Sequence, residues 1–228
     1  MIAVILVLAG IFALSLLPGM WVKRVIAEHA HERSDIEGTG GEFARHLLGR
    51  LGLAHVRVEE STIGDHYDPE AKAVRLLPAH FAGHSLSAVV IAAHEVGHAM
   101  QDATGYAPLR ARTRLAKQAQ KLETVGSVVM LAAPVLMILS KSPYILVMQL
   151  FAGVLILSMT VLIHASTLPT EYDASFRRAL PVLKAGGYLK QEDMPAARKI
   201  LRAAALTYLA AAALSMLDVM RWLRVLRI

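Results

Sequence analysis

The chain contains no cysteine among its 228 residues. This excludes disulfide bridges and thiolate metal ligands, so a metal site here must use histidine nitrogens and carboxylate oxygens. Charged residues are also scarce, at 18% of the chain, whereas 55% of its residues are hydrophobic. Together with a mean hydropathy of +0.47, this composition is too apolar for an ordinary soluble domain and points to a membrane protein.

The few charges are mostly basic, with a formal net charge of +6 and a pI of about 9.7. No basic motif interleaved with aromatic residues is present, so a nucleic-acid partner is not predicted. Many lysines and arginines instead flank apolar runs, where they attract anionic lipid headgroups. Membrane lipid is therefore one predicted partner.

The first apolar run, Met1 to Met20, has no charged side chain and is long enough to span a bilayer as a helix of about 20 residues. It lacks the preceding basic segment and the small-residue cleavage site of a signal peptide. We expect residues 1–21 to be a retained transmembrane anchor. Because Lys23 and Arg24 follow it directly, the positive-inside rule places the next segment in the cytoplasm.

Two further apolar runs cover residues 125–139 and 145–163, separated by Lys141-Ser142-Pro143. They predict a transmembrane helical hairpin over residues 125–163; a pair of buried core helices is the alternative. A shorter run at 203–217 has basic residues at both ends, which suits a helix at the membrane interface or packed on the hairpin, and leaves a full span open.

Between these runs lies a polar part, residues 22–124, whose patterns indicate mainly helices with a small β-hairpin or sheet. Residues 42–53 read as a helix, residues 55–59 alternate as a strand does, and residues 65–77 read as a hairpin. The strand at 73–77 could pair with an extended peptide or be purely structural. Because two crossings return the chain to the same side, residues 164–228 can join this part in one site.

The most informative motif is His94-Glu95-Val96-Gly97-His98. Positions four apart share one face of a helix, so the two histidines can bind one zinc ion. Glu95 can then accept a proton from zinc-bound water. The alternative is a solvated surface helix or buried histidines satisfied by hydrogen bonds. The apolar flanks disfavour it, because burying these polar groups without partners costs several kcal/mol.

A catalytic zinc site usually has a third protein ligand, and Glu171 is the candidate. Pro169 stops a preceding helix, and Thr170 with Asp173 forms a plausible capping box, so Glu171 would project from the first turn of the next helix. Alternatively, Glu171 only interacts with the positive end of that helix.

Three segments of the sequence resemble the YugP-type neutral zinc metallopeptidases of bacterial membranes. They are Ala92 to Gln101, Asp65 to Pro69, and Leu168 to Ser175, and the resemblance extends over nearly the whole chain. More distantly, the chain is similar to the HtpX and CAAX prenyl protease group. There the third ligand opens a Glu-x-x-x-Asp motif, whereas this chain has Ser175 in the Asp position. Asp173 is the alternative partner for a ligand histidine.

The resemblance implies endopeptidase activity with zinc. Taken with the apolar runs and the Lys23-Arg24 pair, it predicts a zincin-like, multi-pass integral membrane protein of bacteria with its active site on the cytoplasmic face. His94, His98 and Glu171 would hold Zn²⁺, and Glu95 would be the general base acting on a peptide or membrane-protein substrate. An oxyanion-stabilising group is also expected, and the candidates are His164, Tyr172 and Arg177.

Two other functions fit parts of the sequence. A non-catalytic membrane scaffold could keep a structural zinc site, which a fourth protein ligand would favour, and none stands out. A metal transporter could load through His29 and His31, but the apolar runs lack ligands along their length.

Overall fold

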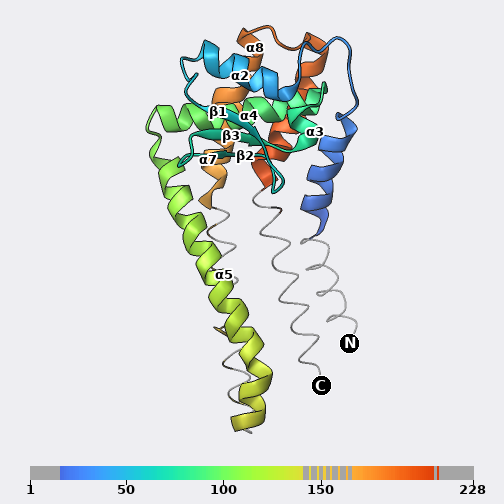
Figure 1. Cartoon of the computed structure of the whole chain (residues 1–228). Coiled ribbons are helices and arrows are strands. Elements are labelled where there is room, and N and C mark those ends of the chain that lie inside the picture. Colours follow the sequence, from blue (N-terminus) through green and yellow to red (C-terminus); the bar gives the residue numbers. More distant parts are fainter. Residues whose placement is uncertain are drawn as a thin grey trace. The chain divides into compact units, whose positions relative to one another are not determined.

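The computed structural model describes residues 16–140 and 166–207, and eight single positions: 144, 148, 151, 152, 155, 159, 163 and 210. The chain divides into two units. One consists of residues 1–20, 111–168 and 208–228. The other, called the sheet unit below, consists of residues 21–110 and 169–207 and contains all three strands (Figure 1).

The described chain begins with a helix over residues 16–28, and the first half of the chain then continues with seven elements. They are α2 (Gly40–Arg50), β1 (Arg57–Glu60), β2 (His66–Asp68), β3 (Ala73–Leu76), α3 (Pro78–Phe81), α4 (Leu86–Ala103) and α5 (Ala107–Ser140).

After residue 166 the elements are α7 (Leu168–Tyr172), the π-helical turn η1 (Asp173–Ala179), α8 (Leu180–Ala185) and the 3₁₀ turn η2 (Gln191–Asp193). Residues 194–207 are also helical. The predicted class of mainly helices with a small sheet is confirmed.

The three strands form one sheet in the order β1-β3-β2. β1 is parallel to β3, and β2 is antiparallel to it with Tyr67 opposite Val74. The predicted hairpin over residues 65–77 is therefore present. The suggested pairing of β3 with a peptide is wrong, because β3 is the central strand and both of its edges already carry a neighbour.

Helix α4 is the element around which the sheet unit packs, and it contacts α2, α3, α8, η1, β2 and β3. Ser85 caps its first turn, accepting a hydrogen bond from the Ala88 N–H at 3.2 Å. Its apolar side chains join a core with Leu47, Leu76, Leu183 and Leu201. A helix buried on nearly every side is a rigid support for polar side chains placed on it.

The predicted inserted transmembrane hairpin, and with it an integral membrane fold, is wrong for the part of the chain that the structure describes. There, no helix is both long enough and apolar enough to cross a bilayer. The expected first arm at residues 125–139 is the second half of the single 34-residue helix α5. Its first half carries the charged stretch from Arg110 to Glu123, so charged and apolar residues share one helix.

The remaining membrane predictions concern other positions. The anchor over residues 1–21, the hairpin arm at 145–163 and the run at 203–217 lie largely outside the described residues. Of that last run, residues 203–205 and 210 are buried, whereas Leu206 is half-buried and Thr207 is exposed.

Helix α2 can approach α4 closely because Gly40 has no side chain. A Cβ atom at this position would lie 2.2 Å from the carbonyl oxygen of His80 and 2.9 Å from that of Ala88. Both obstacles are backbone atoms of helices α3 and α4, which cannot rotate away as a side chain can. The packing of α2 on α4 therefore depends on this glycine.

We predict that Gly40→Ala lowers the free energy of unfolding by about 1–3 kcal/mol, the usual cost of overpacking. Thermal unfolding followed by circular dichroism measures the effect. Gly49→Ala in the same helix is the matched control, because nothing lies within 4 Å of its Cβ position and alanine stabilises helices over glycine. Equal melting temperatures of Gly40→Ala and wild type would contradict this account of the packing.

Candidate metal centre

Three buried side chains, those of His94, His98 and Glu171, meet inside the sheet unit. Their candidate ligand atoms all lie within 4.8 Å of one another. The Glu171 Oε2 atom is 3.3 Å from Nε2 of His94 and 3.2 Å from Nε2 of His98. Relative exposures of 3%, 2% and 0% exclude the alternative of a solvated surface helix. The structure thus brings together the three residues that the sequence marked as candidate ligands.

Two of the three spacings between these atoms match a tetrahedral zinc site. Two ligands bound to zinc at about 2.0–2.1 Å in tetrahedral geometry are separated by about 3.3–3.4 Å. The two nitrogen-to-oxygen distances here, 3.3 and 3.2 Å, are close to this value. Two imidazole nitrogens and one carboxylate oxygen are also ligand types that zinc prefers. The residues present therefore fit a zinc ion.

The backbone that carries Glu171 reaches α4 because of Gly97, which lies between the two histidines. A Cβ atom at Gly97 would be 2.6 Å from the carbonyl oxygen of Ala174 in η1. Only glycine permits this approach without moving one of the helices. Helix α7 itself begins at Leu168, so the predicted capping box at Thr170 is wrong and Pro169 lies within the first turn, where proline is tolerated.

The hydrogen bonds of Ser175 determine which ring nitrogen of His94 carries its hydrogen. The Ser175 hydroxyl donates to the Leu201 carbonyl at 3.0 Å, because a carbonyl oxygen can only accept. The Ser175 oxygen, 2.9 Å from His94 Nδ1, therefore accepts a hydrogen bond from that nitrogen. This leaves the lone pair of Nε2 directed toward Glu171 and available to a metal.

The hydrogen bonds of Gln101, which is fully buried, determine in the same way which ring nitrogen of His98 carries its hydrogen. The Gln101 amide nitrogen donates to the Thr170 carbonyl at 2.8 Å and to the Asp173 carboxylate at 2.9 Å. Its amide oxygen must then face His98, whose Nδ1–H donates to it at 2.9 Å. One side chain thus orients a histidine on α4 and holds the turn that carries Glu171.

Asp173 supports this arrangement indirectly. Burial raises the pKa of its carboxyl, but hydrogen bonds from Arg178, at 2.8 Å, and from Gln101 outweigh burial, so the pKa lies below its ordinary value. The carboxylate therefore stays ionised and accepts from the Gln101 amide. Asp173, predicted as a partner of a ligand histidine, contacts Gln101, whereas Ser175 and Gln101 contact the histidines themselves.

The other predicted site residues lie as follows. Glu95 follows His94 on α4 and is 5% exposed. Tyr172 is 57% exposed and its ring lies against Phe176, and Arg177 is exposed on η1. His164 lies outside the described residues.

Gln101 is a site residue that the sequence reasoning missed. A usable signal was present, because residues three apart on a helix are neighbours and Gln101 follows His98 by three. On a buried helix, the Gln101 amide has few possible hydrogen-bond partners other than the neighbouring His98. The role of Ser175 was harder to foresee, since the long-range contact with His94 depends on how η1 packs on α4.

Comparison with known proteins agrees with this centre. A family model described as "Putative neutral zinc metallopeptidase" matches residues 4–227. The chain is 32% identical over 211 residues to the "Putative membrane protease YugP" of Bacillus subtilis (strain 168), covering 90% of each chain. No solved structure shows significant similarity.

We predict that Gln101→Met, which keeps the side-chain volume but removes all three hydrogen bonds, weakens zinc affinity by roughly 10–100-fold, as loss of a partner of a ligand histidine does. Competition with a chromophoric chelator measures this affinity. Gln191→Met, at an exposed position on η2, is the matched control. A folded Gln101→Met protein with wild-type zinc affinity would show that Gln101 has no such role.

Proposed function

Because the chain belongs to the neutral zinc metallopeptidase family, we propose that it is a zinc-dependent endopeptidase with His94, His98 and Glu171 as metal ligands. The observation that carries this proposal is the buried cluster of these three residues, in which both distances from Glu171 to the histidines are close to those of a tetrahedral zinc site. Zinc bound there supplies Lewis-acid chemistry, polarising the scissile carbonyl and acidifying bound water.

Glu95 is the proposed general base. It lies on α4 directly after a ligand, and its carboxylate is almost fully buried, at 5% exposure. It accepts the proton from the attacking water and later delivers it to the leaving amine. Ser175 and Gln101 keep both histidines protonated at Nδ1, so that neither ligand nitrogen needs to reorient during the reaction.

Stabilisation of the oxyanion requires a donor that can reach a bound peptide. Tyr172 follows Glu171 directly and is largely exposed, at 57%, so its hydroxyl can move toward a substrate carbonyl. We propose Tyr172 ahead of Arg177, which lies farther along η1. His164 remains a sequence prediction, since it lies outside the described residues.

The alternative, a scaffold with a structural zinc site, would need a closed set of four protein ligands. Among the residues that the structure describes, no fourth histidine, aspartate or glutamate joins the cluster. An open position supports catalysis over a purely structural role.

We also propose that the protein acts at a membrane, on peptides or membrane proteins. Its relative from Bacillus subtilis is named a membrane protease, and the sequence opens with a run free of charged side chains. A cytoplasmic active site remains a prediction from Lys23 and Arg24. Recovery of the full chain in the soluble fraction of lysed cells would contradict the membrane assignment.

We predict that Glu95→Gln keeps its zinc but cleaves peptides at least roughly a hundredfold more slowly, since general base catalysis contributes about 10²–10⁴-fold. Metal analysis and a peptidase assay on the same preparation separate the two effects. Glu60→Gln, an exposed glutamate of β1, is the matched control and should cleave like wild type. Near-normal turnover of zinc-loaded Glu95→Gln would remove Glu95 from the mechanism.

We predict that Glu171→Ala loses zinc during mild chelation under conditions in which wild type retains it, because one of three protein ligands is removed. Activity should be lost as well. Glu192→Ala, at a side chain that is 75% exposed, controls for the change in charge. If Glu171→Ala retained zinc while Asp173→Ala lost it, the assignment of Glu171 as the third ligand would be wrong.

A further inference from the structure

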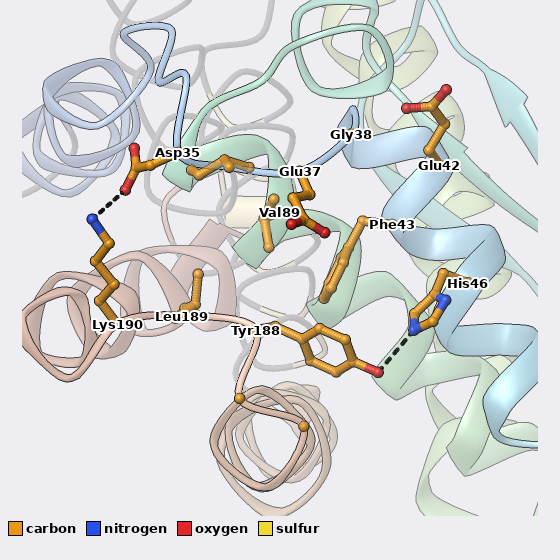
Figure 2. A pocket seen from close by; sticks show the side chains of 13 residues that line it. Asp35, Glu37, Gly38, Glu42, Phe43, His46, Val89, Tyr188, Leu189 and Lys190 are labelled. Carbon is orange, nitrogen blue, oxygen red and sulfur yellow. Dashed lines mark hydrogen bonds and ion pairs between the residues drawn. The ribbon is translucent and has the colours of Figure 1, made fainter.

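A cavity of about 680 Å³ opens in the sheet unit between the start of α2 and the loop that follows α8 (Figure 2). It is lined by residues 35–38, by Glu42, Phe43 and His46 of α2, by Val89 of α4 and by residues 186–190. None of the described residues of the metal centre lines it. Its volume lies within the range of sites that bind small molecules or short peptide segments.

The inner wall of the cavity is apolar, and contacts with Phe43 and His46 hold its Tyr188 ring in place. Phe43 packs edge-on against Tyr188, with ring centroids 5.1 Å apart and planes at 83°. The Tyr188 hydroxyl lies 3.0 Å from Nε2 of His46, which fixes the ring at the cavity edge (Figure 2). A Cβ atom on Gly186 would lie 2.0 Å from this ring. The position of the Tyr188 ring therefore depends on glycine at 186.

The polar side of the cavity is acidic, although the chain as a whole has a net charge of +6. Asp35 is already neutralised by ion pairs with Arg33 and Lys190, at 2.6 and 2.9 Å. The charge of Lys190 is therefore also paired, with Asp35. Glu42 accepts a hydrogen bond from the Thr39 backbone at 2.8 Å, which lowers the pKa of its carboxyl and keeps it charged.

Glu37 is the acidic side chain best placed to meet a ligand. It is exposed and its side chain points into the cavity (Figure 2). Within the described part of the chain it forms no ion pair or hydrogen bond. The cavity thus combines an apolar aromatic wall with a negative charge that no basic side chain of the described residues compensates.

We propose that this cavity binds a lysine- or arginine-bearing segment of a polypeptide, as a recognition site separate from the metal centre. Lysine and arginine have an apolar stem and a cationic head, which match the Phe43–Tyr188 wall and Glu37. The aromatic rings add attraction for a cation. Anionic ligands would meet Glu37 and Glu42 and are disfavoured.

The polypeptide nature of the ligand rests on the proposed peptidase function, because a peptidase meets its substrate as an extended chain. The cavity and the metal centre share helix α4, through Val89 and His94. Five residues along a helix correspond to a rise of about 7.5 Å and a rotation of about 140°, so the two sites face different sides of α4. A substrate bound at the metal centre would pass around this helix to place a basic residue in the cavity, and that residue would lie outside the scissile bond.

Binding is measured by fluorescence anisotropy on the full chain carrying Glu95→Gln, which prevents cleavage. The probe is a labelled hexapeptide with two adjacent lysines between leucines, and its counterpart has glutamines in place of the lysines. We expect the lysine peptide to bind at least about fivefold more tightly at low salt, with a difference that shrinks as salt screens the charges.

Three variants at two positions locate the binding to the cavity. Glu37→Gln should weaken the lysine peptide about threefold, the scale of one exposed ion pair, and Glu37→Lys by about tenfold. Gly186→Ala should also weaken it, by displacing the Tyr188 ring. Glu60→Gln, an exposed glutamate outside the cavity, is the control and should bind like Glu95→Gln alone.

Equal binding of the two peptides, or wild-type binding by both Glu37→Gln and Glu37→Lys, would overturn the proposal. Competition by free butylamine at the same concentration as the peptide would assign the cavity to small amines instead. Gly186→Ala is interpreted only if its melting temperature is normal, and the Glu37 variants decide the question without it. Because zinc is measured separately, loss of zinc in Glu95→Gln would count against the proposed function and leave the peptide result unaffected.

Discussion

A carboxylate buried between two imidazoles is the feature on which the rest of the sheet unit depends. Glu171 is completely buried and contacts Nε2 of both His94 and His98. Burying a charged carboxylate costs several kcal/mol unless an opposite charge compensates it. A divalent cation at this point offsets that cost and links α4 to the segment after residue 168. The hydrogen bonds of Ser175 and Gln101 orient the two histidines that contact Glu171.

The sequence marks three of the candidate site residues through a local pattern. His94, Glu95 and His98 lie on one buried helix. Once this helix is assigned, their spacing alone shows which of the three side chains share a face of it. The β-hairpin over residues 65–77 was predicted for the same reason. The candidate third ligand, Glu171, came from a helix boundary at Pro169 that was placed slightly too late, and the structure places this residue beside both histidines.

Other features depend on contacts between distant segments and could not be read from local patterns. The Ser175 hydroxyl reaches His94 only because Gly97 lets η1 pack closely on α4. The central position of β3 depends on β1 joining as a parallel strand. The prediction of a transmembrane helical hairpin was wrong because the average apolarity of residues 125–139 did not reveal that they continue the charged first half of α5.

The central claim is that this chain holds one zinc ion with two imidazoles, one carboxylate and an open position. X-ray absorption spectroscopy at the zinc edge of the purified full chain tests it most directly. The account predicts one zinc per chain, two imidazole ligands, and remaining ligands that are oxygen atoms at about 2.0–2.2 Å. Three or more imidazoles around the zinc, or a folded chain that binds no zinc when zinc is supplied, would contradict it.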